Sequence, residues 1–411
     1  MGKKAKKIIY LDYGILIPYL ILAVLGIIMA YSASSYRLMN SIPPRAPWSD
    51  ALKESVFLVI SFVLIIVLYK MKTELFQNKR LIMTGIGIIS IMLFLTRFTP
   101  LGAEVNGARG WLKFGPLGNI QPAEFLKIMI VWYLAYIFAR RQDIIKDNFK
   151  KAALGPLFLV GFLICLVLIQ PDTGGAVILF LIAAVLILAS GLRFLYSVLF
   201  IGGLGVFGYI GVWVVSKIPQ SMYPSSFTHV YGRFASYKDP FLDPYDLGHQ
   251  MVNSYYAIYR GGWFGKGLGN SVQKKGFLPE AHSDFMFSII LEELGLIVGI
   301  GLLLLLLFLI LRIIWIGIQA TTAFNSLMCI GIGGMMLIQT FVNVGGITGL
   351  IPLTGVTFPF LSQGGSSLLT LSIGIGFVLN IRANELRRHY EGDLQPKAEI
   401  IPMVDRQQVE N

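Results

Sequence analysis

Long apolar stretches separated by short polar connections dominate this chain. Ten of them approach the roughly 20 residues that an α-helix needs to cross a bilayer. Mean hydropathy is +0.70 and only 14% of the residues are charged, whereas soluble domains carry about a quarter. The pattern predicts an all-α polytopic membrane protein with about ten transmembrane helices, near residues 13–33, 54–70, 81–97, 121–139, 153–170, 174–190, 193–215, 284–311, 324–344 and 365–382.

The distribution of lysine and arginine predicts the orientation. The net charge is +12, and basic residues gather in alternate connections, which should face the cytoplasm. Both termini then lie in the cytoplasm, as an even number of spans requires, and no nucleic acid is needed to explain the charge. We expect a basic N-terminus at 1–12, a transmembrane domain at 13–382, a polar cytoplasmic tail at 383–411, and a long extracellular loop at 216–283 between the seventh and eighth helices.

Asp284 stands where the long loop meets the eighth apolar stretch, which places a carboxylate at the boundary between water and lipid. Carboxylates at membrane depth are costly and usually mark a substrate or proton path. Asp284 could instead cap the following helix. Its neighbours Glu280 and His282 favour a reactive role, and capping and reactivity can coexist.

Further charged residues lie within the apolar stretches. Glu124 and Lys127 are three residues apart and therefore share one face of the fourth helix. They can serve a substrate, or form a self-neutralising ion pair that lets the helix insert; the cost of buried charge favours a function. Glu292 and Glu293 point to different faces of the eighth helix, and we expect one of them to meet a basic partner such as Lys127 or Arg109.

Three segments rich in glycine or proline interrupt the pattern. Residues 170–175 form a tight turn in which Asp172 is as readily a helix cap as a functional group. Residues 261–271 contain repeated glycines but lack the strand, the helix start and the ending of a nucleotide loop. Their backbone amides could approach an anionic headgroup, or the segment is a compact turn. Residues 349–367 are apolar yet irregular, so they should line the same outward cavity as Asp284.

Several motifs together resemble the SEDS family (shape, elongation, division and sporulation), whose members are peptidoglycan glycosyltransferases. The motifs are NGARGW, QPAEFLKI, QPDTGG, LPEAHSDF and GLIPLTGVTFPFLSQGGSS. The resemblance covers about residues 13–382 and is stronger to the division-type (FtsW-like) branch than to the elongation-type (RodA-like) branch. Ser283 replaces the usual threonine, Gly110 stands where many members carry a second arginine, and Gln363 replaces a common tyrosine.

The resemblance implies that lipid II is polymerised into β-1,4-linked glycan on the outer face of the bacterial cytoplasmic membrane, at the division septum. It implies that Asp284 is the general base, that Glu124 and Lys127 are catalytic, and that Arg109 is a functional arginine of the outer loop. Substrate contacts are expected from Asn106, Arg109, Lys266, Glu280, His282, Ser366 and Ser367.

The expected leaving group, undecaprenyl pyrophosphate, needs positive charge. Lys127, Arg109 or a divalent cation (Mg²⁺ or Mn²⁺) could supply it; no metal ligands are assigned and no nucleotide is expected. The expected partners are lipid II, a class B penicillin-binding transpeptidase and other division proteins of the membrane. An elongation-type polymerase and a lipid II flippase are the alternatives, and the flippase would need a polar path to the cytoplasmic side.

Overall fold

The structure is a computed structural model that describes residues 7–105, 108–113, 115, 118–192, 194–215, 217–218, 222 and 228–393. Within these residues nine helices are long and apolar enough to cross a membrane, and a shorter apolar helix of 17 residues, α8, completes the ten expected spans. The ten are α1 (Tyr13–Met39), α2 (Ser49–Lys70), α4 (Lys79–Phe98), α5 (Pro122–Arg140), α7 (Phe149–Ile169), α8 (Thr173–Ala189), α9 (Phe194–Val215), α12 (Met286–Gln319), α13 (Ala323–Ile347) and α14 (Gly365–Asp393).

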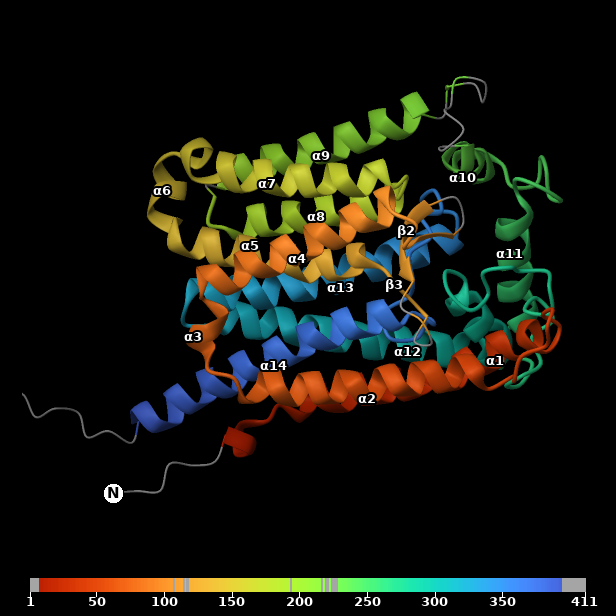
Figure 1. Cartoon of the computed structure of the whole chain (residues 1–411), viewed down its shortest axis with the longest axis horizontal. Helices are drawn as coiled ribbons and strands as arrows, with labels where there is room; N and C mark the ends of the chain where they lie inside the picture. Colours follow the sequence, from red (N-terminus) through yellow and green to blue (C-terminus); the bar gives the residue numbers. More distant parts are fainter. Residues whose placement is uncertain are drawn as a thin grey trace, which may run out of the picture.

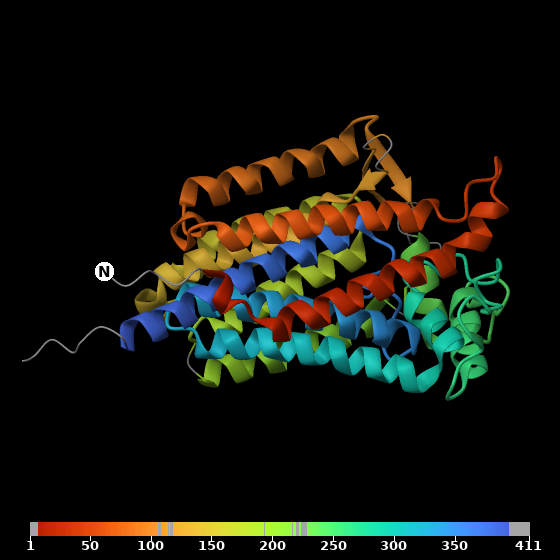
Figure 2. The ribbon, with the colours of Figure 1, turned by 90° about the horizontal axis from the view of Figure 1, so that it is seen from below.

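The ten helices run side by side along the long axis of the molecule (Figures 1 and 2). One end, here called the outer end, carries a small antiparallel sheet with α10 and α11; the opposite end carries the short elements η1, α3 and α6. The start of α1 and the end of α14 lie together at that opposite end, as an even number of crossings requires. The short elements are η1 (Lys7–Tyr10), α3 (Thr73–Phe76), β1 (Gly102–Val105), β2 (Ala108–Lys113), β3 (Asn119–Ile120), α6 (Gln142–Asp147), α10 (Thr228–Lys238) and α11 (His249–Gly261).

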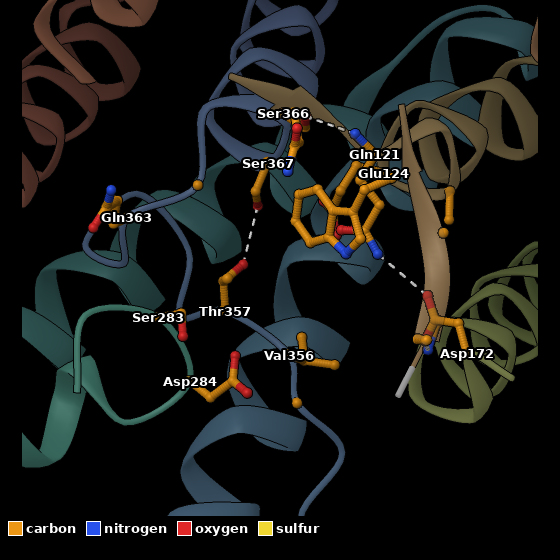
Figure 3. A pocket seen from close by; sticks show the side chains of 18 of the residues that line it. Gln121, Glu124, Asp172, Ser283, Asp284, Val356, Thr357, Gln363, Ser366 and Ser367 are labelled. Atoms are coloured by element: carbon orange, nitrogen blue, oxygen red, sulfur yellow. Dashed lines mark hydrogen bonds between the residues drawn. The ribbon is translucent and has the colours of Figure 1, made fainter. Parts of the chain in front are cut away.

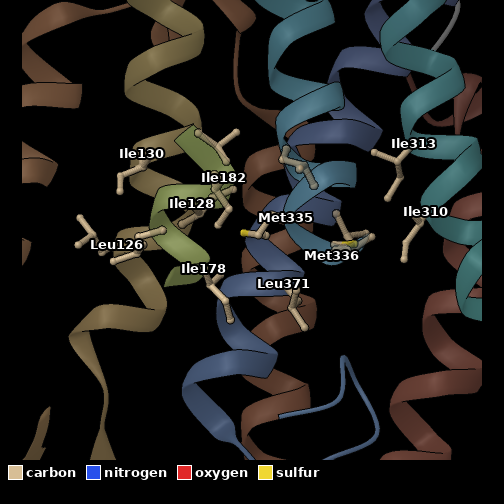
Figure 4. Packing of buried hydrophobic residues seen from close by; sticks show 14 of the residues in the cluster. Leu126, Ile128, Ile130, Ile178, Ile182, Ile310, Ile313, Met335, Met336 and Leu371 are labelled. Carbon is tan, nitrogen blue, oxygen red and sulfur yellow. The ribbon is translucent and has the colours of Figure 1, made fainter. Parts of the chain in front are cut away.

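The core lies among α5, α8, α13 and α14. Helices α5, α13 and α14 are mostly buried within the protein, whereas none of the described residues of α9 is buried. Isoleucine, leucine and methionine side chains from α5, α8, α12, α13 and α14 interdigitate at the centre of the bundle (Figure 4). The sequence of a helix that is apolar on all sides does not show which face is buried. The arrangement of the helices is therefore set by packing and could not be predicted from the periodicity of the sequence.

Helix α12 is broken close to its outer end. Gly295 has φ 81° and ψ 171°, which residues with a side chain rarely adopt. A Cβ on Gly295 would clash with the backbone nitrogen of Gly265, and one on Gly265 would clash with the Glu293 carbonyl. Both glycines are therefore needed where the 261–271 segment crosses the break. The long outer loop is therefore folded back onto α12.

Four features differ from the prediction. The 98–120 connection contains a three-stranded sheet in the order β1-β2-β3, and the long loop contains α10 and α11. Helix α12 runs to Gln319, past the expected end at 311. Helix α14 continues to Asp393, so the boundary expected at 382 falls inside a helix, and its polar last turns are held by Glu385, which accepts hydrogen bonds from Thr321 and Asn325.

Candidate active site

A cavity of about 360 Å³ opens at the outer end of the bundle. We call it the outer cavity. It is lined by side chains from α2, β2, α5, α8, α10 and α14, by the loop before α12, and by the irregular 349–364 segment (Figure 3). Among the lining residues are Glu124, Lys127, Asp172, Arg233, Glu280, His282, Asp284, Ser366 and Ser367.

Asp284 is held through its backbone. The side-chain amide of Asn343 on α13 donates to the Asp284 carbonyl at 2.8 Å and to the Val356 carbonyl at 2.6 Å. Helix α12 begins at Met286 after Phe285, with no side-chain cap, so Asp284 does not cap it. The carboxylate points into the outer cavity (Figure 3).

The surroundings of Asp284 raise the pKa of its carboxyl to about 7. Removal from water is the largest cause, because burial disfavours the charged form. The neighbouring Glu280 raises the pKa further, while Arg233 opposes both effects. A carboxyl tuned in this way is suited to accept a proton near neutral pH.

The loop that carries Asp284 is hydrogen-bonded to the irregular segment that precedes α14. The Ser362 hydroxyl donates to the Ser283 carbonyl at 2.6 Å, and the Gln363 backbone N–H donates to the His282 carbonyl at 3.0 Å. The Ser283 hydroxyl donates to Glu280 Oε2 at 2.7 Å. The expectation that the proline- and glycine-rich segment walls the cavity of Asp284 is therefore confirmed.

His282 is held in its neutral form. Arg37 Nη1 lies 2.9 Å from His282 Nε2, and Arg37 Nη2 donates to Asp50 at 2.8 Å. Burial, and then the charge of Arg37, lowers the pKa of His282 to about 4. A neutral imidazole that accepts from an arginine anchors the loop to α1 and α2; it is not a source of protons at neutral pH.

Glu124 and Lys127 meet on α5 as their spacing predicts. Lys127 Nζ donates to Glu124 Oε1 at 2.6 Å and contacts Gln339 Oε1 at 3.4 Å. Lys127 is only 2% exposed, so its charge acts in a low-dielectric environment. Gln339 in turn donates to Ser367 at 3.2 Å, which links α5, α13 and α14 at the floor of the cavity.

Three helices begin at the wall of the outer cavity. Pro122 opens α5, the Asp172 carboxylate caps α8 by accepting from the Gly175 N–H at 2.8 Å, and α14 starts beside Ser366. Asp172 Oδ2 also accepts from Gln121 at 3.2 Å (Figure 3), and burial raises its pKa. Asp172 is thus both a cap and a cavity residue, and convergent helix N-termini favour a negatively charged ligand.

Arg233 is a cavity residue that the sequence did not reveal. It lies on α10 and donates from Nη1 to the Thr354 carbonyl at 2.9 Å. A side chain at Gly355 would lie 2.8 Å from Arg233 Nη2 and 3.3 Å from Asp284 Oδ2, so the cation and the carboxylate converge on this glycine. No sequence motif identifies Arg233 as a site residue. Its role becomes evident only in the folded chain, where it lies next to the Asp284 loop.

A family model described as cell cycle protein (FtsW, RodA, SpoVE) matches residues 14–387. The chain belongs to this family. The predicted family and the all-α polytopic fold are thereby confirmed.

Members of the FtsW/RodA/SpoVE family resemble this chain over most of its length. A probable peptidoglycan glycosyltransferase FtsW of Lactococcus lactis is 44% identical over 404 residues, which cover 92% of this chain and 94% of that protein. The Bacillus subtilis protein of the same name is 34% identical and covers 90% of each chain. A solved chain from a peptidoglycan synthase complex that coordinates polymerization and crosslinking is 26% identical with a TM-score of 0.70, covering 91% of this chain and 98% of that one. A variant of Thermus thermophilus RodA is 25% identical with a TM-score of 0.63 and the same coverage.

Most of the site residues predicted from the sequence lie together in the structure, but not all of them do. Arg109 lies on β2, and its side chain donates to the Thr99 carbonyl at 3.0 Å. Its neighbours Ala108, Gly110 and Trp111 line the cavity, whereas Arg109 is not among the lining residues. Lys266 is exposed in the glycine-rich loop and does not line the cavity. Asn106 lies outside the described residues.

A basic partner was expected for one of Glu292 and Glu293, and both have one, but neither partner is Lys127 or Arg109. Both side chains are fully buried. Glu292 pairs with Arg260 at 3.2 Å, and Glu293 pairs with Lys274 at 2.6 Å and accepts from Ser32 on α1. The two carboxylates also accept from backbone N–H groups of the 269–273 segment, because this loop folds back over the break in α12. Its amides therefore bind the protein's own carboxylates and not a lipid headgroup.

No preformed metal site is visible in the described part of the chain, since no three His, Cys, Asp or Glu side chains converge there. Two carboxylates of the outer cavity are engaged by protein groups: Glu124 by Lys127, and Asp172 by Gly175 and Gln121. A Mg²⁺ ion bound through substrate phosphates needs only one or two protein carboxylates. The donor set does not match an all-protein metal centre.

Proposed function

We propose that this chain is a peptidoglycan glycosyltransferase that polymerises lipid II at the outer end of the bundle, with Asp284 as the general base. The observation that carries the proposal is the position of Asp284, which faces the outer cavity beside Arg233; Lys127 lines the same cavity. The names of the FtsW relatives support the activity. The pKa of about 7 for Asp284 supports its role.

The reaction joins two saccharides by a single displacement. The 4-hydroxyl of an N-acetylglucosamine unit attacks the anomeric carbon of the donor sugar and loses its proton to Asp284. A new β-1,4 C–O bond forms as the C–O bond to undecaprenyl pyrophosphate breaks, with inversion at carbon. A positioned base contributes about 10²–10⁴-fold to such a step, and cleavage of the pyrophosphate-linked donor supplies the driving force without a nucleotide.

The leaving pyrophosphate requires positive charge, and we assign this to Lys127, Arg233 and the N-termini of α5, α8 and α14. Stabilisation of developing charge by preorganised donors is usually the largest catalytic contribution. Arg233 takes the role expected of Arg109, because Arg233 lines the outer cavity and Arg109 does not. Any divalent cation is proposed to arrive bound to the pyrophosphate oxygens, and no step is assigned to it.

A flippase would need a polar route through the bundle. The centre of the bundle is filled by apolar side chains that are at most 3% exposed: Leu126, Ile128, Ile130, Ile178, Ile182, Met335, Met336 and Leu371 (Figure 4). A charged headgroup could not pass this layer without a large rearrangement. The geometry therefore favours an enzyme that works from one side.

We further propose a division-type role. The higher identities to FtsW proteins than to RodA structures support it. A septal location, cytoplasmic termini, and association with a class B penicillin-binding transpeptidase and other division proteins are parts of the same proposal. The likeness to a chain from a complex that coordinates polymerization and crosslinking supports a transpeptidase partner.

The test is polymerisation of purified lipid II by the full chain in nanodiscs, with and without a class B transpeptidase. We expect wild type to form glycan and Asp284→Ala to lose at least about 10²-fold in rate. Asp284→Asn, which keeps the shape, should be equally impaired. Full polymerisation by either variant would overturn the role of Asp284, and an inactive wild type under every condition would overturn the activity.

A further inference from the structure

A second cavity of about 430 Å³ meets the outer cavity at Asp284. Arg233, Glu280 and Asp284 line both. The second cavity lies under α10 and the start of α11, and its own residues include Ser236, Tyr245 and Gln250. We propose that it is the subsite for the saccharide that carries the attacking hydroxyl, while the outer cavity holds the donor pyrophosphate. This proposal rests on the proposed function.

The placement suits the stereochemistry. An inverting displacement brings the nucleophile and the leaving group to opposite faces of the anomeric carbon. A base between two cavities can receive the proton of a hydroxyl that enters from one of them while the leaving group remains in the other. A single cavity would have to accommodate both sugars and the pyrophosphate.

The two linings differ in chemistry. Lys127 and the starts of α5, α8 and α14 belong to the outer cavity alone. Arg233 is the only Lys or Arg among the described residues of the second cavity, and Asp246 and Glu280 oppose it there. Ser236, Tyr245, Gln250 and His249 supply the rest of its polar side chains, and hydroxyl, phenol, amide and imidazole groups hydrogen-bond neutral sugars.

The second cavity is fixed to the rest of the site. Ser254 on α11 hydrogen-bonds Ser288 on α12 at 2.8 Å and donates to the Ile347 carbonyl at 3.2 Å. Helix α11 therefore holds Gln250 at a set position relative to the loop of Asp284. The Gln250 amide is half-buried, and no other described residue hydrogen-bonds it. Tyr245 is 92% exposed at the rim, where its ring can cover a sugar face.

Two probes separate the subsites. One is a lipid II whose N-acetylglucosamine 4-hydroxyl is capped by a further sugar, so that it can act only as a donor. The other is the lipid II disaccharide-peptide without pyrophosphate or lipid, which can act only as an acceptor. Equilibrium binding of each is measured on the full chain in nanodiscs for wild type, Gln250→Ala, Tyr245→Ala and Lys127→Met, with Gln77→Ala, an exposed glutamine at the opposite end, as the matched control.

Loss of one hydrogen bond should weaken acceptor-probe binding about threefold to tenfold in Gln250→Ala, with Tyr245→Ala in the same direction and capped lipid II unchanged. Lys127→Met should show the reverse pattern. Equal weakening of both probes by Gln250→Ala and Tyr245→Ala, or no effect on either probe, would overturn the subsite assignment. The binding of both probes can be interpreted even if the protein does not polymerise lipid II, because binding is measured without turnover.

Discussion

Glu280 offers a direct test of how Asp284 is tuned. With a pKa of about 7, about nine-tenths of the Asp284 carboxyl is ionised at pH 8 and about one-tenth at pH 6, so the rate of glycan synthesis should fall roughly tenfold between them. Glu280→Gln removes the second-largest cause of the raised pKa and keeps an oxygen that can accept from Ser283. The acidic limb of the pH profile should move to lower pH, yet stay above 3.8, because burial remains.

The assay is the initial rate of lipid II polymerisation from pH 5 to 9, read as the ratio of the rates at pH 6 and pH 8. This ratio is insensitive to a uniform loss of activity. Glu104→Gln, which removes an exposed carboxylate on β1, is the control and should keep the wild-type ratio. If Glu280→Gln shows the same tenfold fall as wild type, or a larger one, the electrostatic account of Asp284 is refuted.

The raised pKa of Asp284 also predicts how the stability of the folded state changes with pH. The folded state keeps the Asp284 proton at pH values where the unfolded chain has lost it. The stability from this proton is fully present below pH 3.8 and is lost as the pH rises through about 7. Asp284→Asn should therefore melt higher than wild type at pH 8, and the difference should shrink toward pH 4. A melting temperature that falls at pH 8 would contradict this.

Three further variants, one of them combined with a second substitution, test the buried charges and the support of the Asp284 loop. Lys127→Met should lower the rate of glycan synthesis about 10²–10³-fold. Adding Glu124→Gln should restore the melting temperature but not the rate. Recovery of both would show that the Glu124–Lys127 pair is purely structural. Lys274→Met leaves Glu293 buried without its cation and should cost about 3–5 kcal/mol of unfolding free energy, measured by denaturant unfolding in mixed micelles. An unchanged midpoint would show that the Glu293–Lys274 pair does not stabilise the fold. Asn343→Leu leaves two buried carbonyls unpaired, at about 1–3 kcal/mol each, and should lower both melting temperature and rate; normal values of both would show that this amide does not hold the loop.

The sequence was sufficient for the spans and for much of the site. Apolar stretches of bilayer length predicted every crossing helix, and charge at the membrane boundary singled out Asp284, Glu124 and Lys127. Their positions depend on local features: a loop before a helix, and a spacing of three on one helical face.

Residues whose roles depend on distant contacts could not be read in this way. Arg233 is one of several cations in a long loop, and only the packing of α10 near Thr354 brings it to the cavity. Arg109 was expected at the site, but its hydrogen bond to the Thr99 carbonyl depends on a strand that is not evident in the sequence. The partners of Glu292 and Glu293 lie in a loop whose path is set by the break at Gly295.

The way the Asp284 loop is held also explains a departure from the family pattern. Asn343, Ser362 and the Gln363 backbone all bind main-chain carbonyls of this loop, so the loop's position does not depend on the side chain at 283. The hydroxyl of Ser283 still reaches Glu280, and threonine would offer the same group. Serine is therefore tolerated at this position, and the carboxylate next to it remains free to face the cavity.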